Sequence, residues 1–110
     1  MSQKPGDTEI TEIALHPQQS VEIWDSVVFN GVVFYALLNR NSNYRLEIWR
    51  RNRHGLVERL WAGDGRYRYA SVSIATSDAS LIVLYSRAKG KTTSTPFLPY
   101  MMTLKNVVSE

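Results

Sequence analysis

The residues best suited to chemistry are arginines interleaved with aromatic side chains in the middle of the chain. Bases and sugar rings stack on aromatic faces while guanidinium groups follow phosphates, so this pattern suits single-stranded nucleic acid or a glycan. The same residue types are the usual anchors of protein interfaces. A purely structural interpretation places the tryptophans in a core and the arginines along strand rims. The candidate binding residues are Trp49, Arg50, Arg51, Arg53, Trp61, Arg66, Tyr67 and Arg68, and Tyr44, Arg45 and Tyr69 extend the pattern.

The residue types that could carry catalysis are dispersed along the chain. Glu47, Glu58 and Asp64 are the acids near the aromatic middle, and no pattern indicates the roughly 5–10 Å separation of a catalytic carboxylate pair. His16 and His54 each stand alone beside a turn residue, without metal-ligand spacing. The chain has no cysteine, which excludes disulfides and thiolate zinc sites. We therefore expect a protein that is not an enzyme and carries no metal or other cofactor.

Charge is distributed unevenly about a basic net charge of +3. Residues 1–25 carry a net charge of −4, whereas residues 40–68 hold eight arginines against three acids, a net charge of +5. A chain with two such regions can attract nucleic acid, an acidic partner or the acidic end of another copy of itself.

Length and composition indicate one folded domain. The chain has 110 residues, of which 44% are hydrophobic and 21% charged, an ordinary globular balance. The N-terminus lacks the apolar region of a secretory signal peptide, and no apolar run approaches ~18 residues. We expect no signal peptide and no membrane span, and both a cytoplasmic and a virion location fit these features.

Short apolar runs separated by tight polar turns predict an all-β fold of antiparallel sheets. Asn30-Gly31 suits a two-residue type I′ hairpin turn, since both of its central residues need a positive φ angle. The strand that follows, Val32–Leu38, is apolar on both faces, as in a central strand covered on two sides. Further along, strand alternation places Arg50 on the opposite face from Trp49 and Arg51.

A repeated pattern indicates blade-type architecture. The apolar run that opens at Ser26 is echoed by the run that opens at Ser71, 45 positions later (71 − 26). Fixed periods of about this size mark β repeats such as propeller blades.

The segment from Arg45 to Asp78 resembles the running pattern of WD-repeat β-propellers, with a strand, a Gly turn, an outer strand and then a Ser-Val-Ser inner strand. Trp49 occupies the place of the repeat tryptophan, whereas Arg50 replaces the aspartate and the Gly-His element is absent. The resemblance is degenerate, covers about residues 21–85 and implies architecture alone, because propellers share no common activity.

The domain organisation follows from this resemblance. We expect a single domain over 1–110, with a tail at 1–7, an edge strand at 8–15 and two blade-like units at 21–61 and 67–104. A small β-sandwich or barrel is the alternative. Two blades cannot close a ring, since propellers typically need at least four, and open edges require a partner.

The sequence therefore predicts an interaction or structural subunit that assembles through exposed sheet edges. Its partners would be copies of itself or a larger protein assembly, such as a phage or virus particle. The alternative is a nucleic-acid- or carbohydrate-binding module that uses the arginine and aromatic surface.

Overall fold

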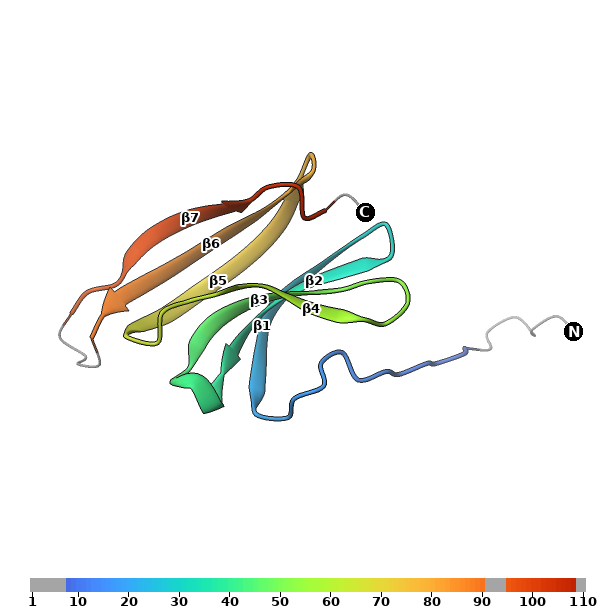
Figure 1. Cartoon of the computed structure of the whole chain (residues 1–110), viewed down its shortest axis with the longest axis horizontal. Coiled ribbons are helices and arrows are strands. Elements are labelled where there is room, and N and C mark those ends of the chain that lie inside the picture. Colours follow the sequence, from blue (N-terminus) through green and yellow to red (C-terminus); the bar gives the residue numbers. More distant parts are fainter. Residues whose placement is uncertain (1–7, 91–94, 109–110) are drawn as a thin grey trace, which may run out of the picture.

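The computed structural model describes residues 8–90 and 95–108 and confirms an all-β fold of antiparallel sheets (Figure 1). Sheet A contains β1 (Val21–Phe29), β2 (Val32–Asn39), β3 (Arg45–Arg51) and β4 (Val57–Ala62), with the short 3₁₀ turn η1 (Arg40–Ser42) between β2 and β3. Sheet B contains β5 (Tyr67–Ser77), β6 (Ser80–Lys89) and β7 (Leu98–Leu104). In both sheets each strand pairs with the next along the chain, so both are meanders, and they do not join into a closed barrel.

The hairpin between β1 and β2 has the predicted two-residue turn. Phe29 pairs with Val32, and the residues between them have positive φ angles, 53° at Asn30 and 77° at Gly31. Positive φ at both central positions defines a type I′ turn, whose twist matches that of the flanking strands.

Strand β2 is buried on both faces, as its sequence predicts. Phe34 and Ala36 point toward sheet B, whereas Tyr35 and Leu37 point to the opposite side, and all four are fully buried. We call the facing sides of the two sheets their inner faces and the opposite sides their outer faces.

The hydrophobic core lies between the inner faces. Each of its large apolar side chains contributes about 1.5–3 kcal/mol when it is transferred from water. The principal members are Phe34, Leu46 and Ile48 from sheet A and Ile74, Leu81 and Val83 from sheet B.

The two sheets approach most closely along β1 and β5, and each of these strands contains a bulge. The register shifts between Ile23 and Asp25 in β1 and between Ala70 and Ser73 in β5. At the second bulge Ser71 takes a positive φ of 55°. Such bulges bend a strand and increase its twist.

The two sheets repeat each other with an offset of 48 positions, not the 45 that the sequence pattern suggests. Asn30 and Asp78 occupy the same position in their two-residue turns (78 − 30). The same offset superposes the bulges, because Asp25 pairs with Ala36 as Ser73 pairs with Leu84. Turns and bulges fix the register of a strand, whereas a recurring Ser-Val dipeptide reflects only local composition.

Residues 8–15 form no edge strand, which corrects the prediction made for this segment. We call it the N-terminal arm. His16, just after the arm, packs on the outer face of sheet A, so the arm leaves across that face and not alongside a strand edge. In Figure 1 the arm runs from the start of β1 away from sheet B, and Ile10 and Ile13 remain 79% and 64% exposed.

Candidate functional site

The outer face of sheet A is organised around a buried carboxylate. Glu47 is fully buried and accepts hydrogen bonds from Arg45 Nε at 2.8 Å, Trp49 Nε1 at 2.8 Å and Asn39 Nδ2 at 3.2 Å. Burial acts to raise the pKa of Glu47, but the three hydrogen bonds outweigh it and the pKa lies below its ordinary value. The carboxylate is therefore ionised, and its oxygens accept hydrogen bonds from the three neighbouring side chains. This arrangement is that of a structural carboxylate and not that of a general base.

Two of the candidate binding residues, Trp49 and Arg51, lie on this outer face. His16 packs edge-on against Trp49, with ring centroids 4.5 Å apart, and a hydrogen bond of 2.8 Å joins its Nδ1 to the Tyr35 hydroxyl. Burial lowers the pKa of His16 and raises that of Tyr35 to about 12. Arg51 Nη1 donates to the carbonyl of Gly55 at 3.0 Å and so holds the β3–β4 turn. His16, which follows the N-terminal arm, thus covers part of the indole of Trp49.

Arg50 points to the opposite face of β3, as alternation predicts. Its Nη1 donates to the carbonyl of Val107 at 2.8 Å, and its Nη2 forms an ion pair with Glu58. Arg50 therefore bridges the sheets, since Val107 follows the last strand of sheet B.

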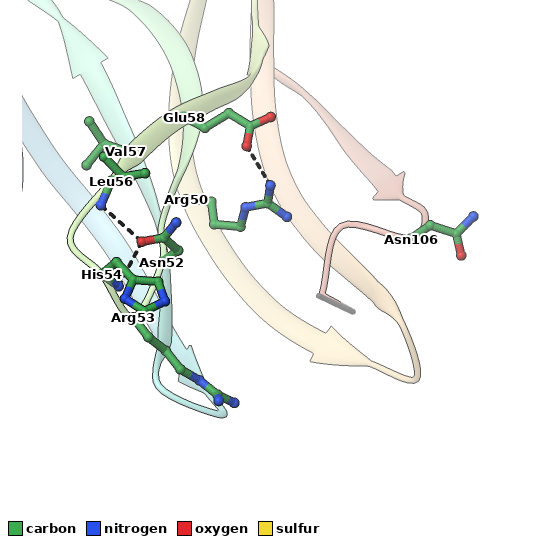
Figure 2. A pocket seen from close by; sticks show the side chains of 8 residues that line it. All are labelled: Arg50, Asn52, Arg53, His54, Leu56, Val57, Glu58 and Asn106. Carbon is green, nitrogen blue, oxygen red and sulfur yellow. Dashed lines mark hydrogen bonds and ion pairs between the residues drawn. The ribbon is translucent and has the colours of Figure 1, made fainter.

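Arg50 also borders a hollow of about 870 Å³ between the β3–β4 turn and the residues that follow β7, where Asn106 lies (Figure 2). Asn52 Oδ1 shapes the turn by accepting from the backbone N–H groups of His54 and Leu56. Arg53 points away toward the β1–β2 turn, where its Nε donates to the carbonyl of Asn30 at 2.6 Å. The lining residues are Arg50, Asn52, Arg53, His54, Leu56, Val57, Glu58 and Asn106.

Trp61 and Arg66 serve local structure. The Trp61 ring packs against the core, with its centroid 6.3 Å from that of Tyr85. Arg66 forms an ion pair of 2.7 Å with Asp64 in the β4–β5 loop. The hydrogen bonds from the Arg66 side chain lower the pKa of Asp64 to about 2. The pair is open to solvent, where such contacts add little to stability.

Tyr67 and Arg68 meet a second group of aromatic side chains at one end of sheet B. The guanidinium of Arg87 lies 4.2 Å from the ring centroid of Tyr67 and 4.3 Å from that of Tyr100. Arg68 lies 4.8 Å from the ring centroid of Phe97 and donates to the carbonyls of Gly90 and Thr95. These are cation–π contacts. Arg87 and Phe97 lie further along the chain than the segment in which arginines and aromatic residues alternate.

Beside this group is a smaller hollow of about 410 Å³ with mainly aromatic walls. Tyr44 on its rim is 58% exposed and has a φ of 57°, in the left-handed region that bulky residues seldom adopt. The lining residues are Leu38, Asn43, Tyr44, Tyr67, Arg68, Tyr69 and Phe97.

The structure therefore divides the eight candidate residues among several places. Trp49 and Arg51 lie on the outer face of sheet A, Trp61 is partly buried against the core, and the others lie at separate turns and strand ends. Tyr67 and Arg68 share a hollow with other aromatic side chains.

The outer face of sheet B is a surface of another kind. Pairing across β5, β6 and β7 places small, hydroxyl and apolar side chains on this face, none of them charged in its central part. Leu84 is 49% and Met101 70% exposed there. An uncharged sheet face open to solvent is characteristic of an interaction surface. The central residues are Ser73, Ala75, Ile82, Leu84, Ser86, Pro99, Met101 and Thr103.

The sequence carries only a compositional signal for this face. The alternate residues of β5 and β6 that form it read Ser-Ala-Ser and Ile-Leu-Ser, without the charges that a solvated strand face ordinarily carries.

Over residues 8–90 and 95–108, no three His, Cys, Asp or Glu side chains are grouped as a metal site would require. Across the same residues the structure has no helix long and apolar enough to cross a membrane. No protein-family model matches the chain, and neither the curated proteins nor the solved structures compared with it give a match.

Proposed function

We propose that the protein is a non-enzymatic structural or interaction subunit that assembles with further copies of itself through sheet B. The observation that carries this proposal is the exposed, uncharged outer face of that sheet. The apolar side chains exposed on this face, Leu84 and Met101 among them, gain free energy when they are covered, at about 25 cal/mol per Å² of apolar area.

The free edge of β7 supports the same proposal. Within the described residues, β7 pairs with β6 on one side and with no strand on the other. Unpaired backbone N–H and C=O groups on such an edge are a template for another strand, and soluble proteins usually protect them.

The carboxylates argue for the non-enzymatic part of the proposal. Glu47 is held by three hydrogen bonds, Glu58 by Arg50 and Asp64 by Arg66. Neither of the two hollows described above is lined by two of these carboxylates, whereas glycoside hydrolysis uses a pair that flanks the scissile bond.

Sedimentation velocity over a range of protein concentrations tests the proposal. We expect a species larger than one chain at micromolar concentration, and its population should fall when Leu84→Asp places a charge on the outer face of sheet B. Leu56→Asp is the matched control, since Leu56 is 69% exposed in the β3–β4 turn. A single-chain species at every concentration would refute the proposal.

A second candidate function rests on the smaller hollow. Its aromatic walls, the exposed Tyr44 and the guanidinium of Arg68 suit a ligand with a flat ring, such as a nucleobase or a sugar. Titration with a short oligonucleotide and with an oligosaccharide, each monitored by tyrosine fluorescence, tests this function. Tyr44→Ala should abolish the signal change if the hollow binds either ligand.

A further inference from the structure

Sheet A has four strands, whereas sheet B has three in the described residues. The two sheets otherwise repeat each other through their hairpins and bulges. Among the described residues, sheet B therefore lacks a counterpart of β4, the fourth and last strand of sheet A.

The repeat defines what would lie opposite each residue of β7. Ala36 and Leu84 are equivalent, 48 positions apart (84 − 36). Ala36 pairs with Ile48 of β3, and Leu84 pairs with Met101 of β7, so Met101 is the counterpart of Ile48. Ile48 in turn pairs with Trp61 of β4. The position equivalent to Trp61, 48 residues earlier (61 − 48), is Ile13.

The N-terminal arm is thus the counterpart of β4 in the order of the chain. The offset of 48 maps the bounds of β4 onto residues 9–14 (57 − 48 and 62 − 48), which lie inside the arm. Both segments directly precede the first strand of a sheet, β4 before β5 and the arm before β1.

The connections that follow the two segments also correspond. The backbone carbonyl of Asp64, after β4, accepts a hydrogen bond at 3.1 Å from the hydroxyl of Tyr69 on the inner face of sheet B. His16, 48 positions earlier (64 − 16), forms a hydrogen bond of 2.8 Å with Tyr35 on the outer face of sheet A. The offset makes these two faces equivalent, because Tyr35 corresponds to the inner-face residue Val83 (83 − 35). Each connection therefore contacts the equivalent face of the sheet that follows it, which is the outer face of sheet A for His16 and the inner face of sheet B for Asp64.

The arm cannot complete sheet B of its own chain from this position. His16 anchors it on the outer face of sheet A, and sheet A lies between that face and sheet B. In Figure 1 the arm and β7 lie at opposite ends of the molecule.

Resting on the proposed function, we infer that the arm of a second copy adds to the free edge of β7 as the fourth strand of sheet B, antiparallel to β7. The register places Ile13 of one copy opposite Met101 of the other. These two apolar side chains are 64% and 70% exposed, and the pairing places them side by side on the outer face of sheet B, where each shields part of the other. Pro99 lies beyond the paired stretch, which covers β7 from Tyr100 to Leu104.

Charge supports the same partner. In sheet A, Val57 of β4 pairs with Arg51 of β3. Glu9 is the counterpart of Val57 (57 − 48), and Leu104 is the counterpart of Arg51. The register therefore puts Glu9 opposite Leu104. Lys105 follows Leu104 directly and is exposed, so the acidic arm meets a basic strand end. Each copy gives one arm and receives another, so two copies can exchange arms in a closed dimer, and more copies can form a ring or a filament.

A disulfide between two singly substituted chains tests the register. Paired Cα atoms across antiparallel strands lie about 4.5–5.5 Å apart, which falls within the range of about 4.4–6.8 Å that a disulfide spans. The chain has no cysteine of its own. Mixing Ile13→Cys with Met101→Cys under mild oxidation should convert most of the protein to a mixed covalent dimer. Mixing Leu56→Cys with Met101→Cys should not, although Leu56 is 69% exposed.

Association measurements give an independent readout on folded protein. Ile13→Asp should weaken association about tenfold, because it removes the apolar partner of Met101 and puts a poor strand former into the added strand, whereas Leu56→Asp should leave it unchanged. Self-association without the mixed dimer and without an effect of Ile13→Asp would overturn this inference and leave the proposed function standing. Absence of any self-association would refute both.

Discussion

The carboxylate of Asp25 in β1 accepts a hydrogen bond at 2.7 Å from the backbone N–H of Ile74 in β5. The contact joins the two sheets where their strands lie closest, next to the bulge in each strand. The Asp25 side chain satisfies a backbone donor of β5, which has a strand partner on one side only, at a buried residue, since Ile74 is 6% exposed.

Replacing Asp25 tests this joint. Asp25→Ala leaves the Ile74 N–H without its acceptor, which should lower the free energy of unfolding by about 1–3 kcal/mol. Asp25→Asn keeps an oxygen acceptor and should lose less. Urea denaturation measures both variants. An alanine variant as stable as the parent would show that the contact contributes nothing.

The type I′ turn gives a second prediction. Gly31 has a φ of 77°, and a Cβ at this position would lie 3.2 Å from the side chain of Arg53. Gly31→Val should therefore destabilise the protein by more than about 1 kcal/mol, since a β-branched residue is strained at positive φ. Gly31→Asn is the matched control, because asparagine tolerates the left-handed region. Equal melting temperatures of the two variants would argue against backbone strain as the cause.

The buried carboxylate predicts a pH dependence. The pKa of folded Glu47 lies below its ordinary value, so Glu47 stabilises the fold while it is ionised. That contribution is complete above about pH 5 and is lost as the pH falls from the unfolded pKa, about 4.3, toward the folded pKa. Glu47→Gln should be less stable at pH 7, and its difference from the parent should shrink in acid. Urea denaturation from pH 7 to pH 3 tests this, and two parallel stability curves would contradict it.

Local pattern was enough to predict much of the fold. The Asn30-Gly31 turn, the doubly covered strand β2 and the opposite faces of Arg50 and Trp49 follow from short-range stereochemistry, which a sequence displays directly. The serines that open the apolar runs recur at 45 positions, whereas the turns and bulges recur at 48, because strand register follows turns and bulges and not a recurring dipeptide.

The candidate site could not be assembled in the same way. Arg50 meets Val107, and Arg68 meets Phe97, across long sequence separations that only the packing of the sheets decides. The prediction of an edge strand at residues 8–15 was wrong. A sequence pattern indicates that a segment can form a strand, but it does not show whether a free sheet edge of the same chain lies beside that segment.

The last prediction concerns nucleic acid, because the chain is basic and rich in aromatic residues. If Arg50 and Arg51 neutralised phosphates of a single strand, each would add about 0.7 to the log–log slope of affinity against salt. In the fold they lie on opposite faces of β3, Arg50 paired with Glu58 and Arg51 bound to the carbonyl of Gly55.

Two arginines placed in this way cannot follow one phosphate backbone. We therefore expect an oligonucleotide to bind weakly at physiological ionic strength, with a salt slope that Arg50→Gln/Arg51→Gln leaves nearly unchanged. Fluorescence anisotropy across a salt series measures the slope, and Arg50→Lys/Arg51→Lys, which keeps both charges, is the matched control. Micromolar binding that the glutamine pair abolishes and the lysine pair retains would show that β3 binds nucleic acid after all.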